Sequence, residues 1–352
     1  MSNDNRFVFI SHCQTMLYLT PDGKFRHTKP TVTGANLFCN ENGELLVDGK
    51  TFEVVRLGPA RSVGLRTEKG FLCAIPEGRI EYRSQCLIWE IFTLLSLDEL
   101  RNALHASPQS FSRKPRDFYI PKTIHQTSFS ENVPKEVSKN VDLLKELNPD
   151  WTYRYWCDKS CHDFIYQYYG WDILKQYLRI NPRYGAARAD LFRYLLIYQF
   201  GGVYLDIKSG STAPFDNIIK PEDQFLLSHW RNSEDDPFPG AGLHSELSFI
   251  PRGEFQNWHI IAAAGHPLLE RAINFVLTNI SRYQAALSGV GTLAVLRLTG
   301  PIAYTLAIYP ELCLYSHRIF DALDAGLLYQ AVSHRPQRKS DHYSKQDTPI
   351  IL

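Results

Sequence analysis

The chain has 352 residues, which is enough for two domains and a sizeable core. Hydrophobic residues make up 44% of it and charged residues 21%, as in an ordinary soluble globular protein. The formal net charge of +1 excludes a general electrostatic attraction to nucleic acid, so we expect no nucleic-acid partner.

Cysteine usage and the amino terminus bear on the cellular compartment. The seven cysteines are odd in number and follow no framework, which argues against a secreted disulfide scaffold. Cys157, Cys161 and His162 hint at a metal site, but no second ligand cluster follows at a suitable spacing, so buried thiols are favoured. The first residues lack the pattern of a signal peptide, and we expect no transmembrane segment. A cytoplasmic protein is therefore expected, with a secreted effector as the alternative.

Residues 1–112 predict a small all-β domain. Short apolar runs alternate with turns that contain glycine, as in β-hairpins. Three units share one pattern, an apolar triplet followed by a turn and a further apolar residue. The triplets are Leu17-Tyr18-Leu19, Leu37-Phe38-Cys39 and Phe71-Leu72-Cys73. This recurrence indicates an internal repeat.

Two stretches of this domain carry a resemblance of their own. Residues 63–67, followed by Gly70-Phe71-Leu72, resemble a repeat of fascin-like β-trefoils, and Trp89-Glu90-Ile91-Phe92 resembles the closing strand. The resemblance implies a trefoil-like domain. Trefoils often bind sugars or proteins, so a recruiting role and a purely structural role both stay open.

A helix and a linker lead into a second domain, residues 117–352. Residues 96–106 predict a helix with a capping box in which Ser96 reaches Glu99, and residues 105–116 have the composition of a linker. Beyond them, strand and helix patterns alternate. The predicted strands are 122–126, 151–156, 203–207, 224–228 and 247–250, and the predicted helices include 135–147 and 267–281. This alternation predicts an α/β fold with a mostly parallel sheet flanked by helices.

The stretch 184–209 is the most informative part of the chain. In a helix, Asp190 and Arg193 share one face beside an apolar stripe. Gly201-Gly202 ends that helix, and the apolar residues that follow predict a buried strand with Asp206 at its carboxyl end. Ligands bind at that edge of open α/β sheets. An unpaired carboxylate there is costly, so Asp206 needs a ligand hydroxyl, a cation or an arginine as its partner.

A purely structural interpretation of the same residues is the alternative. Asp190 and Arg193 are three positions apart, so they can pair whatever the function, and either acid can pair with Arg188. Function is favoured over structure on the local pattern.

Two neighbouring motifs carry a family resemblance. They read Ala187-Arg188-Ala189-Asp190-Leu191-Phe192-Arg193-Tyr194 and Gly201-Gly202-Val203-Tyr204-Leu205-Asp206. Together they resemble the sugar-binding DXD region of family 32 glycosyltransferases, which include fungal mannosyltransferases and bacterial capsule or lipopolysaccharide sugar transferases. The family is distantly similar to the glucosyltransferase domain of the large clostridial toxins. Further stretches match in the expected order, namely 120–126, 253–267, Thr299-Gly300-Pro301 and His342-Tyr343-Ser344.

The resemblance implies a GT-A fold, a nucleotide-sugar donor, a manganese or magnesium ion, and transfer with retention at the anomeric carbon. It implies a glycan or protein acceptor, either a growing bacterial surface glycan or a host protein. UDP-sugars are favoured as donors because the toxin-like arrangement and many bacterial relatives suggest them. The alternative from another class is a non-catalytic module that binds sugar or protein on a degenerate transferase scaffold.

The resemblance also assigns roles position by position. Asp206 would be the first acid of the DXD motif, and Asp190 and Arg193 would contact the donor's ribose and its sugar or phosphate, so these three are the predicted catalytic residues. The predicted donor-binding residues are His125 and Gln126 near the base, Asn257 near the donor sugar, and Arg188 and Lys208. The predicted metal ligands are Asp206, His342 and Ser344, the last two closing over the diphosphate.

Lys208 departs from the family pattern because it stands where the second acid of the DXD motif belongs. An ammonium group cannot be a ligand of magnesium or manganese. Three outcomes are open: Asp206 and His342 hold the metal with water, Lys208 itself neutralises the diphosphate, or the site is inactive. Strand alternation would place Lys208 on the same side as Asp206, which favours the first two.

No carboxylate stands out as the nucleophile of a double displacement, so front-face attack is expected. Glu246 and the run Glu234-Asp235-Asp236 are the candidates. A solvated loop between strands is the favoured interpretation of both.

Overall fold

The computed structural model describes residues 5–11, 15–28, 30–46, 52–57, 62–75, 78–86, 90–105, 114–332, 346 and 348–352. The chain divides into two compact units. The first comprises Met1–Ser107 and Arg282–Gly289, and the second comprises Pro108–Ser281 and Val290–Leu352. Arg282–Gly289, which the sequence placed in the second domain, thus groups with the N-terminal unit.

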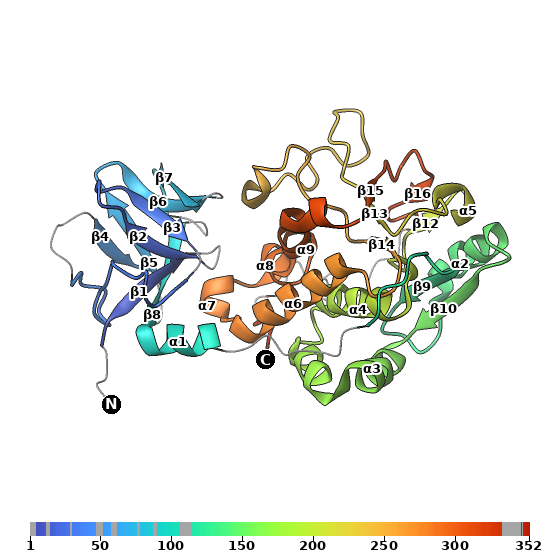
Figure 1. The fold of residues 1–352 in the computed structure, drawn as a ribbon, viewed down its shortest axis with the longest axis horizontal. Helices are drawn as coiled ribbons and strands as arrows, with labels where there is room; N and C mark the ends of the chain where they lie inside the picture. The colour runs from blue at the N-terminus through green and yellow to red at the C-terminus, as the bar shows by residue number, and fades with distance from the viewer. Residues whose placement is uncertain are drawn as a thin grey trace. The chain divides into compact units, whose positions relative to one another are not determined.

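The N-terminal unit is built on one antiparallel sheet. Its strands are β1 (Phe7–Ser11), β2 (Met16–Leu19), β3 (Phe25–Thr28), β4 (Glu53–Arg56), β5 (Ser62–Thr67), β6 (Gly70–Ile75), β7 (Arg79–Arg83) and β8 (Ile91–Ser96). They follow the order β3-β2-β1-β8-β5-β6-β7, with β4 paired to β5 (Figure 1). The two ends of the sheet approach each other, since His27 Nε2 on β3 lies 2.6 Å from the carbonyl oxygen of Ile75 on β6. The sheet therefore curls back on itself.

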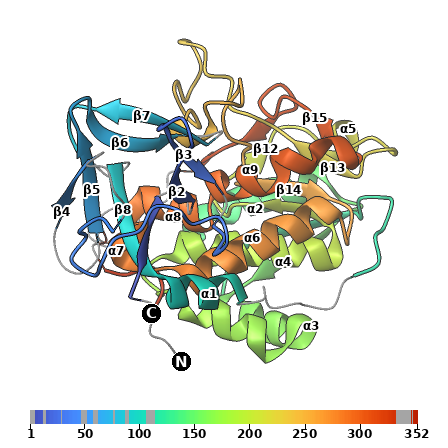
Figure 2. The same cartoon turned by 60° about the vertical axis from the view of Figure 1, so that its left-hand side comes forward.

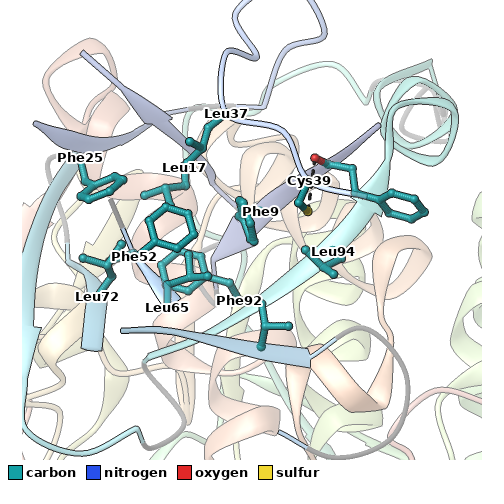
Figure 3. Packing of buried hydrophobic residues seen from close by; sticks show 13 residues of the cluster. Phe9, Leu17, Phe25, Leu37, Cys39, Phe52, Leu65, Leu72, Phe92 and Leu94 are labelled. Atoms are coloured by element: carbon teal, nitrogen blue, oxygen red, sulfur yellow. Dashed lines mark hydrogen bonds between the residues drawn. The ribbon is translucent and has the colours of Figure 1, made fainter. Parts of the chain in front are cut away.

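This unit has its own hydrophobic core, which Figure 3 shows from close by. Three phenylalanines meet at its centre, with ring centroids 5.5 Å apart for Phe9 and Phe52 and 5.4 Å apart for Phe25 and Phe52. Leu65 and Phe92, from β5 and β8, are fully buried against them. Burying each such side chain is worth roughly 1.5–3 kcal/mol, so the apolar triplets of the sequence supply the packing of this sheet.

Two of the three predicted glycine turns are confirmed and are built alike, whereas residues 76–77 of the third lie outside the described residues. In the first, Thr20 N donates to Lys24 O and Gly23 N donates to Thr20 O, and in the second the same pattern joins Asn40, Glu44 and Gly43. The two glycines have φ angles of 75° and 84°, which side chains other than glycine rarely adopt. The third triplet lies in β6, which pairs antiparallel with β7 as expected.

The trefoil itself is not confirmed. The described residues form a single curled sheet in which neighbouring strands are mostly successive in sequence, and they show two matching turns rather than a threefold repeat of whole hairpins. The hairpin predicted around residues 63–72 is present as β5 and β6, and the predicted closing strand is β8, which pairs with both β1 and β5. The predicted capping box is present too. Ser96 and Glu99 exchange hydrogen bonds at the start of helix α1 (Leu97–His105).

The second unit contains a mixed sheet of six strands. These are β9 (Thr123–Thr127), β10 (Thr152–Trp156), β11 (Gly202–Leu205), β13 (Phe225–Leu227), β14 (His259–Ala262) and β15 (Arg318–Ile319), in the order β10-β9-β11-β14-β13-β15. All run in one direction except β14, which is antiparallel to both of its neighbours. A further pair, β12 (Gly210–Ser211) and β16 (Leu327–Leu328), lies outside this sheet.

Helices flank this sheet. They are α2 (Lys135–Leu147), α3 (Asp158–Arg179), α4 (Gly185–Phe200), α5 (Phe215–Ile218), α6 (Pro267–Arg282), α8 (Gly291–Leu298) and α9 (Pro301–Ile308), while α7 (Ala285–Ser288) groups with the first unit. Helix α4 packs on β11 and β14 and against α3 (Figure 1, Figure 2). Ten consecutive or near-consecutive residues of α4 are buried, so this helix is enclosed by protein on nearly every side.

One predicted strand is wrong, and one strand longer than two residues was missed; the two-residue strands β12, β15 and β16 were not predicted either. Residues 247–250 form the end of a 3₁₀ helix, η3 (Ser245–Leu247), followed by a turn in which Ile250 N donates to Leu247 O. Their apolar side chains pack on Ile302 of α9 rather than in a sheet. The missed strand is β14, which lies inside the 253–267 motif. A short apolar run is compatible with a strand and with a packed turn. For that reason residues 247–250 were predicted as a strand and β14 was not.

One stretch of the described residues, Gly291–Leu314, is long and apolar enough by composition to cross a membrane, so the expectation of no transmembrane segment is not confirmed. In the structure it is divided between α8, α9 and the 3₁₀ helix η4 (Tyr309–Leu314). Of its most apolar window, 67% is buried inside the fold, as in the core helices of many proteins.

Candidate functional site

The connection between α4 and β11 sets up the site. Gly201 and Gly202 join them with φ angles of 67° and 95°. A Cβ atom on Gly201 would lie 2.8 Å from Ala264 N, and one on Gly202 would lie 2.5 Å from Thr123 O. Only glycine therefore lets the helix return directly into the middle of the sheet. Asp206 follows the last residue of β11, as predicted.

Arg193 brings two acids together. Its Nη2 lies 2.9 Å from Asp206 Oδ1 and 3.4 Å from Asp190 Oδ1. The side chains of Asp190 and Arg193 are 7% and 5% exposed, whereas that of Asp206 is 33% exposed. Asp206 is thus the member of this triad that faces outward. The predicted grouping of the three residues is what the structure shows.

Asp190 is held by a buried network. Its Oδ2 accepts from Thr299 Oγ1 at 2.8 Å and its Oδ1 accepts from Asn257 Nδ2 at 3.1 Å. Asn257 Nδ2 also donates to Tyr194 Oη at 2.8 Å, and Arg193 donates to the carbonyl oxygen of Asn257. Burial raises the pKa of Asp190 to about 6, although Arg193 and the hydrogen bond from Thr299 pull it downward. Asp190 and Asn257 therefore act here as supports for Arg193.

Asp206 has a different environment. Burial raises its pKa, while Arg193, the hydroxyl of Tyr204 and Lys208 each lower it. Tyr204 Oη donates to Asp206 Oδ1 at 3.1 Å, and the guanidinium of Arg193 lies 4.9 Å from the centre of the Tyr204 ring. The backbone is fixed as well, since Asp206 N donates at 2.8 Å to the carbonyl oxygen of Trp258, the residue just before neighbouring β14. The carboxylate is held rigidly with one side open.

Gln126 holds the turn that follows Asp206. Its Nε2 donates to the carbonyl oxygens of Asp206 and Ser209, at 3.1 and 3.3 Å, and its Oε1 accepts from Tyr153 Oη at 3.0 Å. Gln126 is fully buried. It therefore positions the backbone of the site from β9, and its amide group is engaged by protein partners.

Lys208 lies in this turn and not in a strand. Strand β11 ends at Leu205, and Ser209 N donates to Asp206 O, so the alternation assumed from the sequence does not apply at position 208. Lys208 is still close enough to Asp206 for each to shift the pKa of the other. Burial lowers the pKa of Lys208 and Asp206 raises it.

The described residues do not by themselves form a divalent-metal site. Among them no three histidine, cysteine, aspartate or glutamate side chains gather as a ligand group. Asp206 Oδ1 already contacts Arg193 and Tyr204, and Lys208 occupies the place of the second acid. The other predicted ligands, His342 and Ser344, lie outside the described residues.

Two other predicted donor-binding residues lie away from the triad. His125 has no exposed surface, and its ring packs beside those of Trp156 and Phe200. Burial lowers its pKa to about 3, which is the behaviour of a neutral core histidine, so the prediction that it reaches the base is wrong for this conformation. Arg188 donates to Ile180 O and lies over the ring of Tyr177, which is a structural role.

The candidate carboxylates for a double displacement lie elsewhere. Glu246 is buried in an ion pair with Arg297 at 2.5 Å. Glu234 and Asp235 are exposed, as expected for a solvated loop, while Asp236 is half-buried and lines a pocket.

That pocket is open to solvent and is lined in part by rings, among them those of Trp230, Phe238, Trp258 and Tyr329. Trp230 follows β13 and Trp258 precedes β14, so both lie at the sheet edge where β11 delivers Asp206. The pocket is therefore a neighbour of the acid-arginine triad.

Sequence reasoning missed several residues of this site. Thr299 was noticed only as part of a Thr-Gly-Pro landmark, yet it donates to Asp190. Its position just before α9, where Gly300 and Pro301 start the helix, was the available signal. Tyr204, Trp258 and Tyr329 gave no signal, because apolar strands and loops elsewhere contain the same residue types.

The part of the chain that contains this site is similar to a family of known proteins. Residues 134–226, which include the triad, match the model of the glycosyltransferase sugar-binding region containing DXD motif. The resemblance to family 32 glycosyltransferases is thereby confirmed. The matched region begins one residue before α2 and ends in β13.

Curated relatives agree with that match. The chain is 30% identical over 138 residues to mannosyl phosphorylinositol ceramide synthase SUR1 of Saccharomyces cerevisiae, covering 38% of this chain and 35% of that protein. It is 34% identical over 126 residues to inositol phosphoceramide mannosyltransferase 3 of Schizosaccharomyces pombe, covering 36% and 33%. It is 32% identical over 165 residues to the initiation-specific alpha-1,6-mannosyltransferase of Candida albicans, covering 44% and 42%. The chain thus spans less than half the length of these relatives.

Solved structures give weaker likenesses. The UDP-bound glycosyltransferase domain of the YGT toxin covers 65% of this chain and 82% of that one, with a TM-score of 0.38 and 10% identity. The PaToxG glycosyltransferase covers 60% and 76%, with a TM-score of 0.36 and 18% identity.

Proposed function

We propose that this chain is a hexosyltransferase that moves a sugar from a nucleotide-sugar donor to a hydroxyl group of an acceptor. One observation carries the proposal. Within the region that matches the DXD family, Asp206 stands outward at the carboxyl end of β11 and is paired with buried Arg193. An ion pair that served only stability would not need an exposed carboxylate. The exposed carboxylate of Asp206 can accept hydrogen bonds from the hydroxyl groups of a donor.

The fold supports the proposal. Five strands of the six-stranded sheet run in one direction and β14 alone opposes them, which suits the GT-A class that the motifs imply. In such sheets ligands bind outside the carboxyl ends of the strands. Asp206, its turn and the ring-lined pocket all occur at that edge.

The chemistry follows from the charges. As the bond from the anomeric carbon to the diphosphate oxygen breaks, its electron pair passes to the diphosphate. The acceptor oxygen forms the new bond to that carbon and releases its proton. The cations of Arg193 and Lys208 lie beside Asp206 and meet the charge that develops on the leaving group. A preorganised contact of this kind is worth about 3–4 kcal/mol of barrier.

Retention at the anomeric carbon is part of the proposal. Among the described residues of the triad, only Asp206 is open, because Asp190 is enclosed by Thr299 and Asn257. The candidate nucleophile Glu246 is engaged by Arg297. Front-face attack needs no second carboxylate, so it fits this arrangement better than a double displacement.

A bound divalent metal ion is the property of the family that the described residues support least well. Manganese or magnesium would supply a Lewis acid for the diphosphate. We assign the charge neutralisation in this chain to Lys208 and Arg193. UDP-sugars are the proposed donors from the motifs, and the names of the relatives, which are mannosyltransferases, make GDP-mannose the first competitor.

A donor panel tests the proposal. The protein is incubated with UDP-glucose, UDP-galactose, UDP-N-acetylglucosamine and GDP-mannose, with manganese or with a chelator, and nucleotide release is followed. We expect one donor to be hydrolysed slowly, and Asp206→Asn to abolish that release. The matched control is Asp172→Asn, an exposed aspartate of α3. If no donor is turned over and none binds by calorimetry, the chain is not a transferase.

The second candidate is a non-catalytic sugar-binding or protein-binding module, and Lys208 is the observation that favours it. In that case a nucleotide sugar binds without release of nucleotide. Lys208→Asp tests whether the chain is a transferase scaffold that has lost catalysis. In that case the restored acid would restore turnover of the nucleotide sugar in the presence of manganese.

A further inference from the structure

We propose that the ring-lined pocket beside Asp206 is the acceptor subsite and that it takes a saccharide rather than a side chain of a folded protein. This inference rests on the proposed function. The rings of Trp230, Phe238, Trp258 and Tyr329 form part of its lining, and its polar members include Gln256, Asp236 and the ion pair of Arg231 and Asp321. Neither the family match nor the names of the relatives assigns a role to any of these residues.

The pocket lies within reach of the transfer site. Trp258 joins the two, because its carbonyl oxygen accepts from Asp206 N while its side chain lines the pocket. Tyr329 interacts electrostatically with the same residues. Burial raises its pKa most, Asp206 raises it further, and Arg193 lowers it. Asn257, between Gln256 and Trp258 in the chain, belongs to the buried network of Asp190. Residues 256–258 therefore connect the pocket, the triad and the backbone of Asp206.

The walls of the pocket are preformed. Tyr329 lies 5.2 Å from Trp230 and 5.4 Å from Trp258 between ring centroids, and Phe238 lies 5.3 Å from both Trp230 and Tyr329. Trp230 Nε1 donates to Glu254 Oε1 at 2.7 Å, which fixes the indole. Aromatic side chains that are already fixed lose little conformational entropy when they bury a ligand with apolar and polar faces.

Gln256 supplies the polar contact that points to a ligand. It is 7% exposed and lines the pocket. Its Oε1 accepts from Ser228 Oγ at 2.6 Å, but its Nε2 has no hydrogen-bond partner among the described residues. The Nε2 atom of Gln256 keeps contact with solvent, so it is free to donate a hydrogen bond to a hydroxyl group of a ligand. Asp236 adds a half-buried carboxylate that can accept from another hydroxyl.

These features fit a saccharide better than a protein surface. A sugar ring presents apolar C–H faces to aromatic walls and hydroxyl groups to an amide and a carboxylate. Concave pockets of a few hundred Å³ take small ligands, whereas a folded protein partner needs an interface of about 1,000 Å² or more. The pocket beside Asp206 is open and is lined by side chains of three short segments, 229–238, 256–258 and 321–329, so a small ligand suits it better than a protein surface.

Binding of simple sugars tests the inference. Saturation-transfer NMR is recorded with methyl α-mannopyranoside, methyl α-glucopyranoside and methyl β-galactopyranoside on the full chain, with and without UDP or GDP. We expect at least one glycoside to bind, and we expect neither UDP nor GDP to displace it. Trp230→Ala and Gln256→Leu should weaken that binding at least tenfold, while Trp171→Ala, which removes an exposed tryptophan of α3, should leave it unchanged.

Kinetics separate this inference from the proposed function. In the two pocket variants we expect the KM for the glycoside to rise at least tenfold and hydrolysis of the donor to change far less. Asp236→Asn is a milder variant that leaves the rings in place, and a threefold or greater rise in KM is expected for it. Thermal melting confirms that each variant is folded.

If donor is hydrolysed but no glycoside binds, or if glycosides bind equally well to the folded pocket variants, the inference is wrong and the transferase proposal stands. Transfer to a protein side chain that is insensitive to the pocket variants would also overturn it. If no donor is bound or hydrolysed at all, the proposed function fails first.

Discussion

Arg193 Nη2 lies 2.9 Å from Asp206 Oδ1, and this contact joins the middle of α4 to the end of β11. The arginine is almost fully buried, and its other contacts include the carbonyl oxygens of Ala189 and Asn257 and the carboxylate of Asp190. Two carboxylates thus share one cation, and only Asp206 has an open side. The balance of these charges controls both the stability of the fold and the chemistry of the site.

Removing Arg193 should lower both the stability of the fold and the activity of the site. Arg193→Met leaves two acids close together without their cation, and breaking a buried ion pair typically costs about 3–5 kcal/mol. We expect the free energy of unfolding in urea to fall by an amount of that order and nucleotide release to be lost. Arg183→Met, an exposed arginine before α4, should change neither. A stable and active Arg193→Met protein would show that the triad does not matter.

Asp190 should make stability fall as pH rises through weakly acidic values. Its pKa is raised from 3.8 to about 6, so between these values the folded state binds more protons than the unfolded state. The free energy of unfolding attributable to Asp190 therefore declines from about pH 4 to about pH 6, by about 3 kcal/mol in total. Urea unfolding at several pH values checks this. Asp190→Asn removes the titrating group, so its curve should lack that slope. An identical slope in both proteins would contradict the assignment.

Lys208 should make the site independent of divalent metal. We expect nucleotide release by the natural chain to be unaffected by a chelator and to fall at least tenfold in Lys208→Ala. Lys208→Asp restores a second acid, so it should bind manganese in the presence of nucleotide, as measured by the loss of the free-manganese EPR signal. Loss of activity of the natural chain on chelation, together with manganese binding that needs no substitution, would show that other residues hold a metal.

The glycine pair should be sensitive to substitution for a backbone reason. At Gly202 a Cβ would lie 2.5 Å from Thr123 O, and the φ angle of 95° is unfavourable for any other residue. Gly202→Ala should therefore lower the free energy of unfolding by well over 1 kcal/mol. Gly185→Ala is the matched control, because its Cβ would meet nothing within 4 Å. That substitution, at the first residue of α4, should be neutral or slightly stabilising. Equal effects at the two positions would refute the explanation.

Much of the secondary structure could be predicted because its causes are local. The spacing of Val137, Val141 and Leu144 predicts α2, and the same three residues are buried in it. The capping box of Ser96 and Glu99 and the turns at Gly23 and Gly43 also depend on neighbours in the chain. Errors arose where an apolar run had two uses, as for Leu247 and Ile250, which pack on Ile302 outside any sheet.

The sequence by itself determined that Asp190, Arg193 and Asp206 would meet, because a helix, a double glycine and a short strand leave few alternatives for their positions. Only the tertiary structure decided which acid faces outward. Asp190 is enclosed by Thr299 and Asn257, which are distant in the chain and come close only when α4 packs against the residues before α9 and β14. The burial of His125 and the pocket at Trp230 and Trp258 depend in the same way on long-range packing, which no local pattern specifies.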